Sequence, residues 1–383
     1  MPLSRRSFIL AAGGAGLALV GSGAYFAVTR RPERALQPWE DVQTAFDDVR
    51  LDAFRHAILA PNPHNRQPWH IRLLSADEAV ITCDLDRRLP ETDPFDRQIT
   101  IGFGGFLELA RIAAAERGWR VEIRAFPDGE PQPRLDGRPI AHLRFIKDAG
   151  VAKDPLFTAI TTRRSVKRPF DAGRPVSALD RKRLLGGDDA APYGLSNDSR
   201  LVATLRDLTL KAWSIETNTP RTFMESVNLM RIGRSEIEAN PDGISLGGPL
   251  IETLAALGQV SREEIAKPGS SAFQSGLNVY TDMLNGVASY VWIATKANAR
   301  LDQIEAGRAY VRLNLRASQI GLSMHPVSQA LQEFPEMAEP FQAVHRALNI
   351  AAPERLQMLA RIGYGPAADP APRWPLAAKL TSA

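Results

Sequence analysis

Hydrophobic and polar residues alternate in several short runs of the first half of the chain, which predicts strands at 70–74, 79–84, 119–126 and 141–146. Between the second and third runs, apolar residues recur at helical spacing from Gly104 to Arg117. Further helices are expected within 42–59 and at 154–160. The pattern therefore predicts short strands interrupted by helices.

One of these helical patterns occurs twice. The segment from Gly104 reads GGFLELARIAAAERGW and the segment from Gly307 reads GRAYVRLNLRASQIGL, at a constant offset of 203 residues. Each ends near a glycine, as helix C-termini often do. Gly102-x-Gly104-Gly105 also looks like a dinucleotide-binding turn, but its place in the repeat favours helix packing. The repeat predicts two pseudo-symmetric halves, 46–150 and 151–376.

Two segments fall outside the repeated pattern. Residues 31–45 are polar and are expected to form a linker. Residues 217–273 alternate polar turns, such as NPDG at 240–243, with short apolar runs. Such a segment is typical of a flap laid across a surface, and it predicts a lid-like insertion.

The N-terminal segment begins with Arg5 and Arg6, then Phe8 and an uncharged run rich in Ala and Gly that extends to Val28. This pattern resembles a twin-arginine export signal, a route that carries folded proteins. A signal-anchor helix is the alternative, because the uncharged run is long enough to span a bilayer. We expect residues 1–30 to bring the protein to the export machinery and the periplasm. Membrane contact is expected only through this segment, if it is not cleaved.

Composition argues against several classes of function. Hydrophobic residues at 44% and charged residues at 23% are near the globular average, and the net charge is only +4. Arginines are scattered rather than gathered in a basic stripe with aromatics, so nucleic-acid binding is not expected. The single cysteine, Cys83, excludes an internal disulfide and is expected to be a small buried apolar residue. The six histidines lack close metal-ligand spacing, so no metal site is expected.

The segment 60–69 reads APNPHNRQPW. Three prolines hold such a loop extended, and its Asn and Gln side chains can both donate and accept hydrogen bonds, as the edge of a flavin ring requires. A rigid turn before a strand would have the same composition.

The segment 161–170 reads TTRRSVKRPF. In an extended backbone, Arg163, Ser165 and Lys167 project to one side, where two cations and a hydroxyl form a plausible phosphate cradle. The alternative interpretation is a solvated basic run.

Together the two motifs resemble those of the FMN-dependent nitroreductase superfamily. There an R-x-S-x-[KR] element holds the flavin phosphate, and a P-S-x-x-N-x-Q-P-W loop reaches the same flavin from the other subunit of a homodimer. In this chain Asn62 stands in place of the usual serine, and the Pro-Trp loop precedes the phosphate motif. A fused dimer would explain that order. Each half lacks the motif that the other carries, so the resemblance implies one flavin site in a monomer.

The resemblance continues towards the C-terminus, where residues 323–328 read SMHPVS and Arg373 precedes a closing Pro-Leu. It is densest to a fused, Acg-like branch, whose members carry the phrase DPFDR, here 93–97, and a lid-like insertion. The implied fold is α+β and nitroreductase-like, with mixed sheets flanked by helices and FMN between the two halves. The implied FMN-binding residues are Asn62, His64, Asn65, Gln67, Arg163, Arg164, Ser165, Lys167, His325, Pro326, Val327 and Arg373.

The implied function is an FMN-dependent oxidoreductase that passes two electrons to a small acceptor such as a nitro compound or quinone. The flavin performs the redox chemistry, so no catalytic side chain is assigned. A protein that stores FMN beneath a lid, without turnover, is the alternative, since export separates the protein from cytosolic NAD(P)H.

Overall fold

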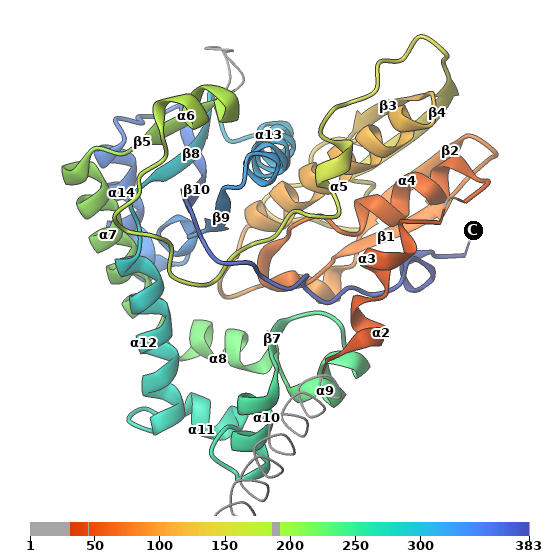
Figure 1. Ribbon diagram of the computed structural model, residues 1–383. Coiled ribbons are helices and arrows are strands. Elements are labelled where there is room, and N and C mark those ends of the chain that lie inside the picture. Colours follow the sequence, from red (N-terminus) through yellow and green to blue (C-terminus); the bar gives the residue numbers. More distant parts are fainter. Residues whose placement is uncertain (1–30, 45, 186–191, 383) are drawn as a thin grey trace, which may run out of the picture.

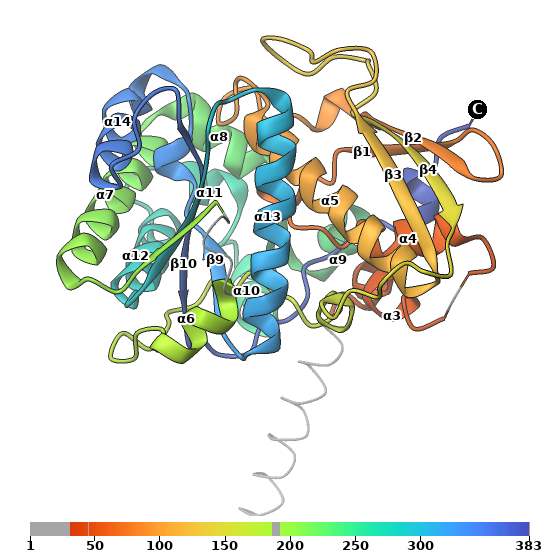
Figure 2. The ribbon, with the colours of Figure 1, turned by 90° about the horizontal axis from the view of Figure 1, so that it is seen from above.

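The computed structural model describes residues 31–44, 46–185 and 192–382. The twin-arginine segment therefore lies outside the described residues. The chain forms two α+β halves that lie side by side, and the long helices α5 (Arg97–Glu116) and α13 (Arg300–Gln319) run between their sheets (Figures 1 and 2).

The first half follows the expected pattern closely. Asp48 caps helix α4 by accepting a hydrogen bond from the Arg50 N–H, and α5 is buried along most of its length, as expected for a helix that is apolar nearly all round. Cys83 is buried, as predicted. The elements of this half are α4 (Val49–Ala57), β1 (Trp69–Leu73), β2 (Glu78–Cys83), α5, β3 (Trp119–Ala125) and β4 (Ala141–Lys147).

The second half is larger and contains two further apolar clusters, one on each side of its sheet. The expected helix at 154–160 is reduced to a single 3-10 turn, Phe157–Ala159. The elements are α6 (Ala178–Leu185), β5 (Tyr193–Ser196), α7 (Ser199–Asn218), α12 (Ser271–Asn285), β8 (Tyr290–Thr295), α13, β9 (Ser323–Pro326), α14 (Ala338–Ala347) and β10 (Arg355–Gly363).

The two sheets have the same topology. Their strand orders are β1-β2-β4-β3 and β5-β8-β10-β9, and in each half two strands precede the long helix and two follow it. All neighbouring strands in both sheets are antiparallel, so the expectation of mixed sheets is wrong. In each half the strand after the long helix lies at the edge of the four-stranded sheet, where its neighbour is the last strand of that half. No crossover therefore joins two parallel neighbours in these sheets.

The glycines aligned in the sequence repeat meet where α5 crosses α13. A Cβ on Gly104 would lie 2.1 Å from the Ile304 carbonyl oxygen, and a Cβ on Gly307 would lie 1.9 Å from that of Ile101. The offset of the repeat exchanges the two contacts, because Gly104 aligns with Gly307 and Ile101 aligns with Ile304, so the crossing is reciprocal. The interpretation of Gly104 as a helix-packing residue is confirmed.

The insertion after α7 forms a layer beneath the two halves (Figure 1). Its chain is mostly helical rather than a series of turns, because its apolar residues pack in short amphipathic helices. The elements are α8 (Pro220–Asn228), β6 (Met230–Ile232), α9 (Gly233–Ala239), β7 (Ile244–Leu246), α10 (Pro249–Ala256) and α11 (Arg262–Ala266).

The expected linker is ordered for most of its length. It contains the short helices α2 (Glu33–Leu36) and α3 (Pro38–Asp41), with Ala35, Leu36 and Trp39 buried. The physical reason is tertiary, because the Trp39 indole N–H donates to the Ala371 carbonyl at 2.8 Å, at the far end of the sequence.

Candidate flavin-binding site

A cavity of about 790 Å³ lies where the two halves and the insertion meet. This volume falls in the range of small-molecule and cofactor sites. Ten of the twelve residues that the resemblance implies line it: Asn62, His64, Asn65, Arg163, Arg164, Ser165, Lys167, His325, Pro326 and Arg373.

The phosphate motif is extended where it enters the cavity. Ser165 forms an isolated parallel bridge with Met324 of β9, and the Val166 N–H donates to the Met324 carbonyl at 3.0 Å. Val166 is buried in the protein, whereas Arg163, Ser165 and Lys167 line the cavity. The three predicted residues thus reach the cavity together, but Arg164 lines it as well, so strict alternation holds only around Val166.

Arg163 is 3% exposed and is held by two hydrogen bonds. One Nη donates to the Leu59 carbonyl at 2.9 Å and the other to the Asn314 side chain at 3.2 Å. Its Nε is buried and has no partner. A buried guanidinium with an unused donor is the group that an anion in this cavity would satisfy.

Arg373 lies beside Arg163 and is equally buried. Its guanidinium donates to the carbonyls of Ile58, Leu59 and Ala60, which follow the C-terminus of α4, and to the Asn65 side chain at 2.6 Å. Carbonyls at a helix C-terminus carry partial negative charge and suit a cation. They position the arginine without neutralising its full charge.

The basic residues of the cavity receive little compensation from carboxylates. Burial lowers the pKa of Arg163 to about 10, lowers that of Lys167, and, with Arg163 and Arg164 close by, lowers that of Arg373 far below its ordinary value. Asp369 raises the pKa of Arg164, but burial outweighs its effect. In residues 31–44, 46–185 and 192–382, no ion pair reaches any of these four cations. The cavity wall is therefore strongly positive.

Trp39 completes this wall. Its ring lies 4.8 Å from the Arg164 guanidinium carbon, 5.4 Å from that of Arg373 and 5.8 Å from that of Arg163. The negative face of an indole ring attracts such cations. Sequence reasoning missed Trp39, because no local pattern distinguishes a tryptophan in a polar segment from an exposed one.

The Pro-Trp loop is strained. His64, Asn65 and Gln67 all have positive φ, at 46°, 53° and 51°, although none is glycine. Such conformations are costly and tend to cluster at ligand sites. The Asn62 side chain stabilises the turn by accepting from the Gln67 N–H at 2.7 Å. Burial, with Lys167 and Arg66 nearby, lowers the pKa of His64 to about 4, so its imidazole is neutral at neutral pH.

Two residues expected to bind flavin do not line the cavity. Gln67 is fully buried, where its side chain donates to the Pro241 carbonyl at 2.7 Å and accepts from the Trp374 N–H at 2.9 Å. Val327 is also buried, and its N–H donates to the Leu359 carbonyl. The structure does not bring these two residues to the cavity, because the buried amide and the buried valine pack the loops that carry the site.

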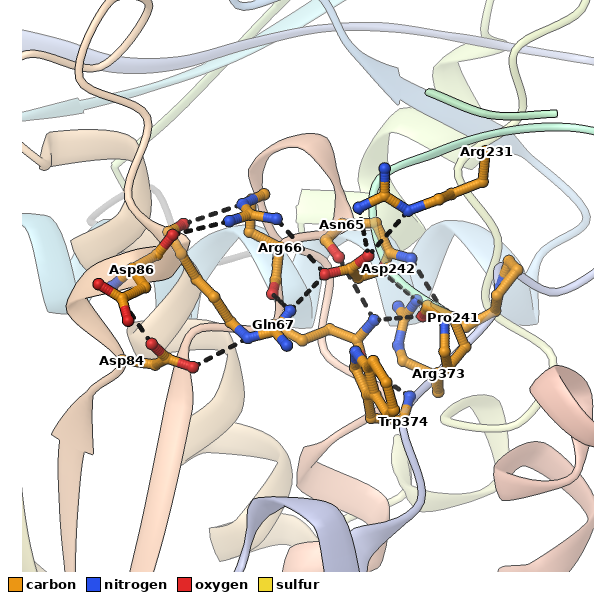
Figure 3. Close-up of polar contacts among 12 residues, drawn as sticks. Asn65, Arg66, Gln67, Asp84, Asp86, Arg231, Pro241, Asp242, Arg373 and Trp374 are labelled. Atoms are coloured by element: carbon orange, nitrogen blue, oxygen red, sulfur yellow. Dashed lines mark hydrogen bonds and ion pairs between the residues drawn. The ribbon is translucent and has the colours of Figure 1, made fainter. Parts of the chain in front are cut away.

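The Pro-Trp loop is tied to the insertion by a group that we call the Asp242 cluster: Asp242, Arg66, Arg87 and Arg231. Asp242 is 4% exposed, and its carboxylate pairs with Arg87, with Arg231 at 2.9 Å and with Arg66 at 3.4 Å. The side chains of Arg66, in the Pro-Trp loop, and Arg231, in β6, both point toward this carboxylate (Figure 3). The Gly243 N–H also donates to the Asn65 carbonyl at 3.3 Å. The insertion is thereby fixed beside the cavity.

The DPFDR phrase of 93–97 has a structural role instead. Asp93 accepts hydrogen bonds from the N–H groups of Gln98 and Ile99 in the first turn of α5. Arg97 pairs with Glu333 at 2.8 Å and donates to the Leu331 carbonyl. The phrase therefore starts α5 and joins the first half to the second.

No group of three or more potential metal ligands occurs in the part of the chain that the structure describes. Across the same residues, no helix has the length and apolar character needed to cross a bilayer.

No protein-family model matches the chain. It is similar to a Mycobacterium tuberculosis H37Rv protein named "Putative NAD(P)H nitroreductase", with 27% identity over 344 residues that cover 83% of this chain and 86% of the relative. A second M. tuberculosis protein of that description, acg, is 31% identical over 124 residues, which cover 32% of this chain and 36% of the relative. The similarity to nitroreductase-named proteins thus extends over most of the chain.

Solved structures of similar proteins superpose only in part. An FMN- and NADPH-dependent nitroreductase, NfnB from Sphigopyxis sp. strain HMH, gives a TM-score of 0.35 at 15% identity, covering 59% of this chain and 97% of that one. Iodotyrosine deiodinase bound to FMN and 3-iodo-L-tyrosine gives 0.32 at 18% identity, covering 57% and 94%.

Proposed function

We propose that this chain binds FMN between its two halves and acts as a nitroreductase-like oxidoreductase. The observation that carries the proposal is the set of four cations that line one cavity wall, Arg163, Arg164, Lys167 and Arg373. Two of them, Arg163 and Arg373, are buried, and Arg163 has an unused donor. A phosphomonoester carries roughly −1.5 to −2 charge at neutral pH and accepts several hydrogen bonds. The nitroreductase names of the relatives support the same choice.

The residues would divide the work as follows. Arg163, Ser165, Lys167 and Arg373 would hold the phosphate, while Asn62, His64 and Asn65 would hold the ring and ribityl chain. The His325–Pro326 segment lines the same cavity, and the His325 imidazole accepts from the Arg361 Nε at 3.2 Å. When bound, FMN supplies the two-electron redox chemistry, and the protein supplies orientation and electrostatics.

A flavin measurement tests the proposal. Protein refolded with excess FMN and then desalted should release about one mole of FMN per mole of chain, because the two halves build one complete site. Two moles would refute the fused-dimer interpretation, and no flavin would refute the FMN proposal. Anaerobic NADPH should then bleach the flavin absorbance. Flavin that stays oxidised with NADPH, and with reductants other than dithionite, would favour storage over turnover.

We also propose export through the twin-arginine route, which is supported by Arg5, Arg6 and the uncharged run after them. Replacing both arginines by lysine should retain the protein in the cytoplasm, because that route recognises the guanidinium pair. Fractionation of cells that express the two forms measures this. Unchanged periplasmic delivery of the double variant would refute the proposal.

A further inference from the structure

A second polar group lines the same cavity and has no part in the flavin site proposed above. It consists of Glu216 near the end of α7, Ser226 of α8, Tyr280 of α12, and Gln329 and Gln332 in the loop after β9. Unlike the phosphate wall, this group contains no lysine or arginine. Its chemistry is that of hydrogen-bond acceptors.

Glu216 is the centre of the group and is 3% exposed. Its carboxylate accepts from the Gln332 Nε2 at 3.2 Å and, more weakly, from the Ser226 hydroxyl at 3.4 Å. Within the described residues no cation pairs with it. Burial is the largest cause that raises the pKa of Glu216, to about 7, and the charge of Glu225 raises it further. A buried carboxyl without a cation is costly when ionised.

Gln332 presents a second acceptor. The residue is 4% exposed and its Nε2 is used by Glu216, whereas its Oε1 is buried without any partner. Buried polar atoms in native proteins are rarely left unpaired, so we expect a hydrogen-bond donor at the Gln332 Oε1. A ligand that donates two hydrogen bonds would satisfy Glu216 and Gln332 together.

Aromatic and aliphatic side chains surround these acceptors. Trp213 and Tyr280 both line the cavity and stack with ring centroids 4.2 Å apart and an interplanar angle of 19°. The Tyr280 hydroxyl donates to Gln329 at 2.5 Å, which fixes its ring. The insertion adds apolar side chains to the same wall: Phe223, Ile244, Leu246, Ile251, Leu254 and Phe273. Such a surface binds rings, and aromatic faces also attract cations.

We infer that this end of the cavity is an acceptor-substrate subsite for ring-bearing amines, whose amino group donates to Glu216 and Gln332 while the ring lies among Trp213, Tyr280 and the apolar residues of the insertion. The inference rests on the proposed function, since it assigns the class of electron acceptor. It also excludes one class, because a carboxylate-bearing ligand would face Glu216 with like charge. The phosphate wall and the amine subsite thus give the cavity two groups of lining residues with opposite preference.

Matched nitroaromatics test the inference. 4-Nitrobenzylamine and 4-nitrotoluene share the ring and the reducible group, but only the first carries an amine. Equilibrium dialysis against the FMN-loaded protein at pH 8 measures binding without turnover. We expect the wild type to bind the amine at least tenfold more tightly than the methyl compound. Glu216→Gln, which keeps the shape of the side chain and removes its charge, should bring the two affinities within about twofold.

A matched control distinguishes the effect of Glu216 from that of the net charge of the protein. Glu263→Gln removes the same charge from an exposed position of α11 in the insertion and should keep the wild-type preference. Unchanged 4-nitrotoluene binding by Glu216→Gln shows that the cavity is intact. If the wild type binds both compounds equally, or if Glu216→Gln keeps the preference, the inference is overturned. Flavin content is measured on the same samples, so a chain that binds the amine selectively but holds no FMN refutes the proposed function alone.

Discussion

The Asp242 cluster and the phosphate wall of the cavity both gather buried arginines, but they differ in how charge is balanced. In the Asp242 cluster one buried carboxylate receives Arg66, Arg87 and Arg231. On the cavity wall, Arg163 and Arg373 receive backbone carbonyls, an asparagine each and the face of Trp39. No carboxylate pairs with the wall anywhere in the described ranges.

The difference separates two uses of arginine that the sequence cannot distinguish. Where the carboxylate is supplied by the chain, the cations serve cohesion and fix the insertion to the Pro-Trp loop. Where dipoles alone hold the cations, the proposed FMN phosphate would complete the balance. Glu216 is the converse case, because its carboxyl is buried and no cation of the described residues pairs with it. One substitution tests the charge balance at each of these three sites.

The largest effect is expected at Asp242. Asp242→Asn leaves three guanidinium groups close together without their shared anion, and removing one partner of a buried ion pair costs about 3–5 kcal/mol. The free energy of unfolding, measured by urea denaturation, should fall by at least that amount. The loss should be greater than for a single pair, because three cations then repel one another.

Asp207 provides the matched control. Its carboxylate pairs with Arg206 at 3.4 Å but is 71% exposed, so Asp207→Asn should change the free energy of unfolding by less than about 1 kcal/mol. If the two variants unfold at the same urea concentration, the Asp242 cluster does not stabilise the fold and the contrast with the cavity wall fails.

The next effect is expected on the cavity wall. Arg163→Ala should weaken FMN binding by about 2–4 kcal/mol, the range for losing one partner of a desolvated charge pair, or on the order of 30- to 800-fold in affinity. Riboflavin lacks the phosphate, so its binding should be weaker in the wild type and nearly insensitive to the substitution. Fluorescence titration of both flavins against both proteins gives the four affinities.

Arg168 belongs to the same basic motif but is exposed and does not line the cavity, so it is the matched control. Arg168→Ala should change FMN affinity by no more than a few tenths of a kcal/mol. Equal losses in the two variants would instead support a solvated basic run. An FMN affinity that survives Arg163→Ala would place the phosphate elsewhere on the chain.

Much of this arrangement could be predicted from local sequence. Alternation located the strands of the first half to within one or two residues, and it placed Arg163, Ser165 and Lys167 on one side. The offset of the repeat anticipated the contact between Gly104 and Gly307. These features depend on residues close in sequence, or on a pattern that the chain repeats.

The features that escaped prediction depend on contacts between distant segments. Trp39 becomes part of the cavity through Ala371 and Arg373, more than 300 residues away. Gln67 matches the family motif but turns away from the cavity, because the Pro241 carbonyl and the Trp374 N–H satisfy its amide. Glu216 and Gln332 come from an α7 helix and a loop with no motif in common. No local pattern records such pairings.

The smallest effect is expected at Glu216, where the comparison concerns a carboxyl without a cation. Its pKa is raised from 4.5 to about 7, chiefly by burial, so the folded state binds more protons than the unfolded state between these pH values. The stabilisation from this group is therefore complete below about pH 4.5 and is lost as the pH rises through about 7. Glu225 of α8 and Tyr280 of α12 are the titratable groups that act on it, while Ser226, Gln329 and Gln332 do not titrate.

Glu216→Gln removes this titration and leaves the other groups in place, so the difference between the two unfolding curves isolates it. From pH 4.5 to pH 7 the wild type should lose about 2–3 kcal/mol relative to the variant, since each unit of pKa shift corresponds to roughly 1.4 kcal/mol. Urea denaturation at intervals of half a pH unit measures the difference. Glu263→Gln should run parallel to the wild type throughout. If stability depended on pH in the same way in Glu216→Gln and in the wild type, the carboxyl would already be paired in the folded protein. That result would remove the charge imbalance that distinguishes the cavity from the Asp242 cluster.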